Sequence, residues 1–415
     1  MVRTRRQAAI VFAVLVAVAW LLFVGARPID ALLLAMPLAW PSWWRSLPRA
    51  RRRRLLCVEV PVLVVAALGG GVALAADAAH TLGASLPIGA GLGFGGYVLL
   101  WVVALRAVQA TVDARILRLR RRRWLARTVA AVVTLLCGLP PLWVALQTHR
   151  IAVPQLPTAP TGRTVEFTTT DGVRLAATFV PAPVANELTP LVVVCHGLGA
   201  NRAACFGYAE LATANGCHAL AFDFRAHGES GGAVATFGHD EVLDVAAAVG
   251  WARSQPELAR APLLLCGVSM GAASALQAAA VVGADGVFTE SSFADLHTMV
   301  AAQARGLGPL APWVADVVAV VATVTLGVDL AAVSPRERLA LLPPELPVCL
   351  VHAGDDVVIP VEQGERLAAA RPGTLLHRIE GAAHGACLAA DPARVGQLFR
   401  DLLAAARAHH STRNK

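Results

Sequence analysis

Ser269 is the residue of this sequence whose surroundings point most directly to chemistry. It is the centre of a G-x-S-x-G motif at residues 267–271, between an apolar run at 262–266 that favours a strand and a small-residue run at 272–282 that favours a helix. The two glycines permit a tight strand-to-helix turn and close approach of neighbouring backbone. This turn would hold the Ser269 hydroxyl at the carboxyl edge of a sheet as a nucleophile. A serine that only caps the helix would not require both glycines.

A serine hydroxyl is a poor nucleophile without a base, and the sequence offers one after a later strand. In this arrangement an acid and then a histidine follow the nucleophile, each at the end of a later strand. His384 follows a predicted strand at 374–379, and Asp355 and Asp356 follow the predicted strand before it. We expect His384 to accept the Ser269 proton and one of the two aspartates to orient the imidazole.

Two backbone N–H groups are expected to stabilise the oxyanion that such an attack creates. The first belongs to Met270, directly after the nucleophile. The second comes from the loop after a predicted strand at 191–195, which reads His-Gly-Leu-Gly at residues 196–199. Its glycines permit the backbone to turn there, and Leu198 is the predicted donor.

Alternating strands and helices must position these residues. Short apolar runs bounded by turn residues predict strands, and longer runs predict helices, so we expect a doubly wound, mostly parallel α/β sheet covered on both faces. Asp171-Gly172 predicts the turn of an initial hairpin. The predicted strands are 164–170, 173–180, 191–195, 218–222, 262–266, 286–289, 347–352 and 374–379, and the predicted helices are 205–215, 240–254, 272–282, 362–370 and 393–408.

The first third of the chain has a different composition. Residues 1–150 carry 19 Arg and four acidic residues, a formal charge of +15, whereas the rest carries 17 basic and 24 acidic residues, a charge of −7. Nucleic acid and a membrane could both bind such a basic block, and long charge-poor apolar runs favour the membrane. We predict an α-helical transmembrane bundle at residues 1–146, with helices at 8–25, 55–76, 86–105 and 125–146, and with 29–44 as either a further span or an interfacial segment.

Arginine-rich loops set the predicted orientation of this bundle. Placing the arginines of 3–6, 45–54 and 106–123 in the cytoplasm puts the C-terminal region on the non-cytoplasmic side. That side is unchanged if the first apolar run is instead a cleaved signal peptide. A proline-containing linker at 147–163 then leads to a soluble domain at 164–415.

Residues 291–346 are predicted to form a small helical cap within the soluble domain. The stretch 313–328 is apolar enough to resemble a span. A membrane crossing there would separate Ser269 from Asp356 and His384, so we interpret it as a lid helix. We hypothesise that this lid faces the bilayer and admits an amphiphilic ester or amide.

From about residue 164 to the C-terminus the sequence resembles the α/β-hydrolase superfamily. It looks most like bacterial serine hydrolases grouped with the serine aminopeptidase S33 and prolyl-oligopeptidase-like domains. The resemblance is carried by H-G-x-G at 196–199, D-x-R-x-H-G-x-S at 223–230, G-x-S-x-G at 267–271 and the late Asp and His. It implies that the acid lies four residues after His352, which is Asp356, with Asp355 second. It also implies a structural role for the 223–230 block. Ala226 and Ala353 depart from glycine in the family pattern.

These observations predict a membrane-anchored serine hydrolase that cleaves an ester, thioester or amide of a small or lipid-like acyl substrate through an acyl-enzyme. The alternative is a non-catalytic membrane module that uses a hydrolase-like domain for binding or scaffolding. We expect an integral protein of a bacterial cell membrane, with the bilayer and an acyl substrate as partners, and no nucleic acid. No cofactor is implied, and the absence of H-x-x-x-H and C-x-x-C pairs argues against a metal. The sequence predicts no oligomeric state.

Overall fold

The computed structural model describes Thr148 and residues 162–413. The chain divides into two units, residues 1–145 and 146–415, and the description below concerns the second. The predicted spans between residues 8 and 146, and the predicted linker up to residue 161 apart from Thr148, lie outside the described residues. The first strand begins at Arg163, so the last residue assigned to the linker belongs to the sheet instead.

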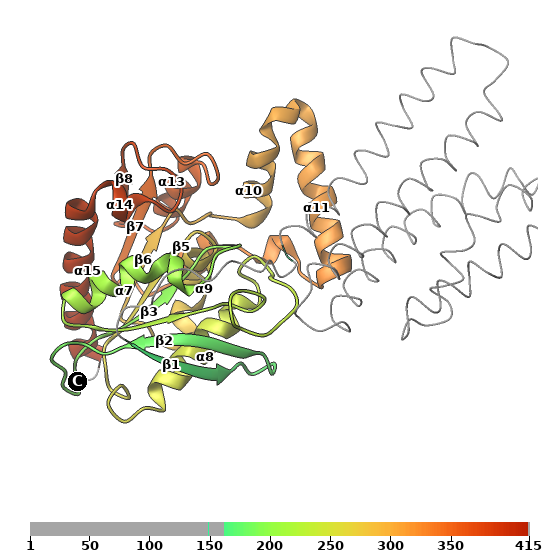
Figure 1. The fold of residues 1–415 in the computed structure, drawn as a ribbon. Coiled ribbons are helices and arrows are strands. Elements are labelled where there is room, and N and C mark those ends of the chain that lie inside the picture. Colours follow the sequence, from blue (N-terminus) through green and yellow to red (C-terminus); the bar gives the residue numbers. More distant parts are fainter. Residues whose placement is uncertain (1–147, 149–161, 414–415) are drawn as a thin grey trace, which may run out of the picture. The chain divides into compact units, whose positions relative to one another are not determined.

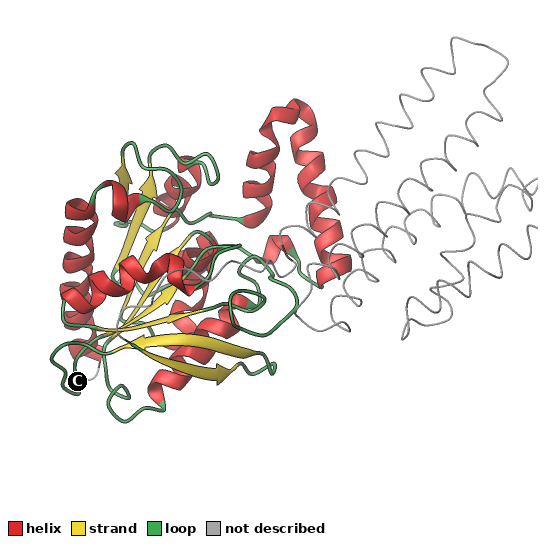
Figure 2. Ribbon diagram, viewed as in Figure 1, coloured by secondary structure: helices red, strands yellow, loops and turns green. Residues whose placement is uncertain are grey.

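An eight-stranded sheet organises the described domain, with the strand order β1-β2-β4-β3-β5-β6-β7-β8. β1 and β2 are antiparallel to their neighbours, and the other six strands run parallel (Figures 1 and 2). The expected mostly parallel sheet is therefore confirmed. The strands are β1 (Arg163–Thr168), β2 (Arg174–Val180), β3 (Leu191–Cys195), β4 (His218–Phe222), β5 (Leu263–Val268), β6 (Gly286–Glu290), β7 (Val348–Ala353) and β8 (Leu376–Ile379).

The burial of each strand follows from its sequence. β3 reads LVVVC and β4 reads HALAF, and every residue of both strands is buried, as expected for parallel strands covered on both faces. β1 lies at the sheet edge and is only partly buried. The hairpin between β1 and β2 turns at Gly172, whose φ of 88° lies in the left-handed region that glycine adopts without strain.

Helices cover both faces of the sheet and form two apolar clusters with it (Figure 2). One cluster includes side chains of α8 (Glu241–Arg253), α9 (Met270–Val282), α12 (Pro335–Ala340) and α13 (Val361–Ala370). The other includes side chains of α7 (Phe206–Ala214), α14 (Cys387–Ala390) and α15 (Pro392–Arg413). The two layers hold the ends of the central strands rigidly, which is where the site described below lies.

The segment between β6 and β7 contains α10 (Leu296–Gln303), two 3₁₀ turns, α11 (Ala311–Leu326) and α12. α10 and α11 stand side by side as a helical pair (Figure 1). Asp295, at the start of α10, accepts hydrogen bonds from Arg336 and Arg366 and so fixes the start of α10 to α12 and α13. Within the part of the chain that the structure describes, no helix combines the length and apolar character needed to span a bilayer.

Candidate active site

The turn that carries Ser269 is strained in the way the motif predicts. Ser269 has φ 57° and ψ −122°, a conformation that costs a non-glycine residue free energy and persists only where the surroundings enforce it. A Cβ atom on Gly267 would lie 2.4 Å from the Gly271 carbonyl oxygen, and one on Gly271 would lie 2.2 Å from the Cys195 carbonyl oxygen. Both glycines are therefore required by close backbone packing. The Ser269 N–H donates to the Glu290 carbonyl at 2.8 Å, which fixes the turn to β6.

The structure brings Ser269, His384 and Asp356 into one chain of hydrogen bonds. His384 Nε2 lies 2.9 Å from Ser269 Oγ, and His384 Nδ1 lies 2.6 Å from Asp356 Oδ2. An ionised carboxylate only accepts, so Nδ1 carries the hydrogen and Nε2 is free to accept the serine proton. The serine comes from the end of β5, the aspartate from the loop after β7 and the histidine from the loop after β8.

Asp356, and not Asp355, is the carboxylate that reaches His384. The Asp356 side chain is fully buried, and its Oδ1 atom accepts the N–H groups of Val358 at 2.9 Å and Ile359 at 2.7 Å. Burial alone would raise the pKa of Asp356, but the hydrogen bonds from His384 and the Ile359 N–H outweigh it and lower the pKa below its ordinary value. Asp355 is exposed, and its N–H donates to the Ala382 carbonyl, which ties the two loops together.

Met270 and the loop that contains Leu198 both lie next to Ser269. Met270 is the first residue of α9, and the first N–H groups of a helix have no partner within it. The loop with Leu198 comes close to the serine, because a Cβ on Gly197 would lie 3.2 Å from Ser269 Cβ and 3.7 Å from Ser269 Oγ. A substrate oxygen near Ser269 would therefore lie between these two backbone segments.

Two buried histidines hold this loop in place. His196 Nε2 accepts the Phe224 N–H at 3.0 Å, and His227 Nε2 accepts the Gly199 N–H at 3.0 Å. Burial and the nearby His227 lower the pKa of His196 to about 3, so its ring stays neutral and keeps a lone pair for Phe224. Hydrogen bonds to the rings of these two histidines therefore join the H-G-x-G segment to the 223–230 block.

The remaining charges of the 223–230 block are engaged in ion pairs. Arg225 pairs with Asp244 at 2.7 Å and Asp171 at 2.8 Å, and Asp223 pairs with Arg202. None of these groups contacts Ser269 or His384 among the described hydrogen bonds. This arrangement agrees with the structural role that the resemblance implies for the block.

Ser291 is a residue of the site that the sequence patterns did not single out. It is fully buried and has φ 51°. Its hydroxyl accepts the Ala353 N–H at 3.3 Å, and its side chain contributes to lowering the pKa of Asp356. It directly follows β6, so its position after an apolar strand was the available signal. His352 is another buried neighbour: its Nε2 donates to the Ile359 carbonyl at 2.9 Å, and burial lowers its pKa. His352 therefore supports the Asp356 loop rather than competing with His384.

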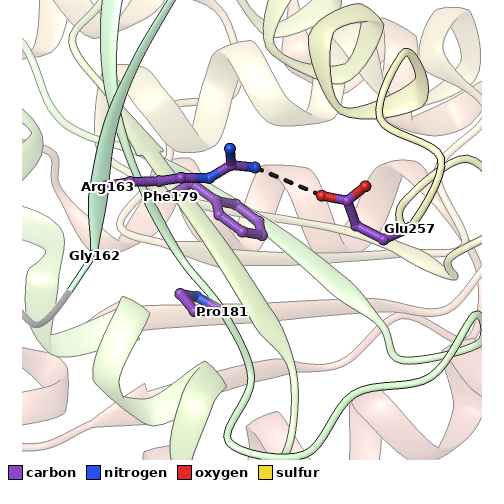
Figure 3. A pocket seen from close by; sticks show the side chains of 5 residues that line it. All are labelled: Gly162, Arg163, Phe179, Pro181 and Glu257. Carbon is purple, nitrogen blue, oxygen red and sulfur yellow. Dashed lines mark ion pairs between the residues drawn. The ribbon is translucent and has the colours of Figure 1, made fainter.

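Metal-binding clusters and cavities are the remaining features of the described region that could bear on function. Among the described residues there is no group of three or more His, Cys, Asp or Glu that could hold a metal ion. One described cavity, lined by Gly162, Arg163, Phe179, Pro181 and Glu257, lies where β2 ends beside the start of β4 (Figure 3). That is the amino edge of the parallel strands, opposite the edge that carries Ser269.

Several known proteins resemble parts of this chain. A model of the alpha/beta hydrolase family matches residues 192–398. The chain is 31% identical over 189 residues to the uncharacterized Bacillus subtilis protein YqkD, an alignment that covers 44% of this chain and 61% of that protein. It is 28% identical over 260 residues to an uncharacterized Mycobacterium tuberculosis protein, covering 60% and 84%. A solved Pyrococcus furiosus esterase superposes with TM-score 0.48 and 25% identity, covering 62% of this chain and 98% of the esterase.

The family match over residues 192–398, the sheet order and the nucleophile turn together show that the described residues have the α/β-hydrolase fold.

Proposed function

We propose that this protein is a serine hydrolase that cleaves an ester, thioester or amide of a small or lipid-like acyl substrate. The observation that carries the proposal is the continuous hydrogen-bonded chain from Ser269 Oγ through His384 to Asp356, at 2.9 Å and 2.6 Å. These distances lie within the reach expected between a nucleophile, its base and the group that orients the base.

In the proposed first half-reaction, Ser269 Oγ bonds to the acyl carbon while its proton passes to His384 Nε2. Asp356 holds the imidazole in the tautomer that can accept this proton and stabilises the imidazolium that forms. The substrate carbonyl becomes an oxyanion, and the N–H groups of Met270 and Leu198 are the proposed donors to it. His384 then returns the proton to the leaving alcohol, thiol or amine as the bond between the acyl carbon and that group breaks.

In the second half-reaction, water replaces the leaving group. His384 takes a proton from the water as the water oxygen bonds to the acyl carbon. Collapse of the second oxyanion breaks the bond to Ser269 Oγ, and the serine recovers its proton from His384. The products are a carboxylic acid and the alcohol, thiol or amine released earlier.

Apolar side chains beside the acid support an acyl substrate. Val357 and Val358 follow Asp356 and are 90% and 42% exposed. The side chain of Gln303, at the end of α10, donates to the Val358 carbonyl, so the cap segment lies next to this loop. Exposed valines at such a position can contact the hydrocarbon of a bound acyl group.

The proposal is tested by labelling the full chain with a fluorophosphonate, which reacts covalently with an activated serine. We expect rapid labelling of the wild type and none of Ser269→Ala. Ser274→Ala is the matched control, because Ser274 lies on the same helix and its hydroxyl donates to the Met270 carbonyl at 2.9 Å. Equal, slow labelling of wild type and Ser269→Ala would instead favour the non-catalytic binding module.

We further propose that residues 1–146 anchor the hydrolase domain in a bacterial cell membrane, with that domain on the non-cytoplasmic side. The apolar runs and the arginine distribution of the sequence support this. A reporter fused after Lys415 tests the side: alkaline phosphatase activity is expected, and fluorescence from a reporter that folds only in the cytoplasm would contradict it. Recovery of the chain in the membrane fraction after a carbonate wash tests the anchoring itself.

A further inference from the structure

Glu290 is a fully buried carboxylate beside the site that the reaction proposed above does not use. It is the last residue of β6, and its carbonyl accepts the Ser269 N–H at 2.8 Å. Its side chain extends toward the loop that carries His384, where Oε1 accepts the Cys387 N–H at 2.9 Å. One residue therefore contacts the backbone of the nucleophile and the loop that carries the proposed base.

The loop that carries His384 depends on such contacts for its position. It lies between the end of β8 at Ile379 and α14 at Cys387, and it has left-handed glycines at both 381 and 385. The Asp355 N–H holds its first half through the Ala382 carbonyl. Glu290 holds its second half at Cys387, three residues after His384.

The groups around the Glu290 carboxylate are all donors. Oε2 accepts the Tyr208 hydroxyl, Oε1 accepts the Cys387 N–H, and the Cys387 thiol also donates to it. Burial, then the charge of Glu290, raises the pKa values of Tyr208 and Cys387, so both side chains stay neutral and keep their hydrogens. A buried carboxylate held by several donors is a rigid anchor, because losing any one contact leaves a buried polar group unpaired.

We propose that Glu290 is a positioning residue for His384, which it holds against the strand end that carries Ser269. This rests on the proposed serine hydrolase function, and it assigns Glu290 no contact with the substrate. The carboxylate acts by fixing the loop.

Two variants of the full chain test the positioning role of Glu290. The readout is the rate of fluorophosphonate labelling per folded molecule. Glu290→Ala removes the anchor, and we expect the rate to fall on the order of 100-fold, the cost of a misplacement of about 1 Å in a reacting group. Glu290→Gln keeps an oxygen for the Cys387 N–H, so the maximal rate should stay within about 3-fold of wild type.

Glu241 provides a matched control. It is also a fully buried glutamate with three donors, the Thr236 N–H and hydroxyl and the Gly238 N–H, but it lies on α8. Glu241→Gln and Glu241→Ala should lower the melting temperature without changing the labelling rate per folded molecule.

The outcomes distinguish this proposal from the function on which it rests. If Ser269→Ala is labelled like the wild type, the serine hydrolase function fails. If the wild type is labelled through Ser269, but Glu290→Ala reacts at the wild-type rate, Glu290 is not a positioning residue. Should Glu290→Ala not fold, Glu290→Asp decides, because its shorter side chain draws the carboxylate away from the Cys387 N–H: a wild-type labelling rate in this variant overturns the proposal.

Discussion

The described domain contains an aspartate–histidine pair at each edge of its sheet. At the carboxyl edge His384 donates to Asp356 at 2.6 Å, and at the amino edge His410 lies 2.9 Å from Asp285. Both aspartates are fully buried, and both accept backbone N–H groups, which Leu263 supplies to Asp285. The geometry within each Asp–His pair therefore does not distinguish the pair at the carboxyl edge from the pair at the amino edge.

The two Asp–His pairs differ in their surroundings. The second nitrogen of His384 meets a serine hydroxyl on a strained turn, next to the free end of a helix. Asp285 instead faces Arg413 at 3.5 Å and His409 at 3.6 Å, so side chains of the C-terminal helix α15 surround it. The amino-edge pair fixes α15 to the sheet. An Asp–His pair therefore indicates catalysis only when a nucleophile and oxyanion donors complete it.

The largest expected effect sets the two histidines against each other. His384→Gln should lower the fluorophosphonate labelling rate by about 10⁴-fold or more, because Ser269 then has no base. His410→Gln should leave that rate unchanged. Labelling kinetics on both variants at equal folded concentration check this, and a loss of similar size in both would contradict the assignment of the site.

The two aspartates give the second test. Asp356→Asn should reduce the labelling rate by about 10³- to 10⁴-fold, because the amide leaves His384 in the wrong tautomer. Asp285→Asn should keep activity and cost about 1–3 kcal/mol of unfolding free energy, since buried hydrogen bonds to charged groups are lost. Urea unfolding and labelling of both variants provide the comparison, with Asp355→Asn as an exposed control expected to match wild type.

A smaller effect concerns pH and the loop beside the nucleophile. Burial lowers the pKa of His196 to about 3, whereas the unfolded chain binds this proton near pH 6.5. Below pH 6.5 the unfolded state therefore binds more protons, and this residue makes stability fall by up to about 1.4 kcal/mol per pH unit toward pH 3. His196→Asn should flatten that slope in urea unfolding measured between pH 7 and pH 5. Parallel curves for the two proteins would show that His196 is not the cause.

The smallest effect is expected at the amino edge. Arg413→Ala removes an ion pair that is 42% exposed on the arginine side and a hydrogen bond to the Gly283 carbonyl at 3.0 Å. Exposed pairs contribute little, so the loss should be below about 1 kcal/mol, and labelling should not change. A loss above that of Asp285→Asn would mean that Arg413, rather than His410, holds α15.

Much of the fold could be predicted because local sequence and burial agree there. The runs 191–195 and 218–222 predict buried parallel strands, and β3 and β4 have those bounds. The G-x-S-x-G motif predicts a turn that requires both glycines, and Gly267 and Gly271 both lie against backbone that leaves no room for a Cβ. In contrast, α15 extends to Arg413, beyond the predicted end at 408, because contacts with Asp285 stabilise its last turn.

Other features depend on contacts between distant residues. Asp355 and Asp356 are identical neighbours in the sequence, and only their burial and the reach to His384 distinguish them. Glu290 and Ser291 carry no motif, yet one meets the His384 loop and the other meets Asp356. His196 and His227 belong to separate motifs. Each ring accepts a backbone N–H of the other loop, and these hydrogen bonds form only when the two loops pack together.

The sequence by itself determined the order of strands and helices, the nucleophile turn and the residue types of the site. These follow from apolar periodicity and from the backbone freedom of glycine, both of which act over a few residues. Only the tertiary structure decided which aspartate orients His384, which Asp–His pair meets a serine, and where Glu290 points. Those choices depend on distances of 2–4 Å between groups up to 115 positions apart, and no local pattern encodes such distances.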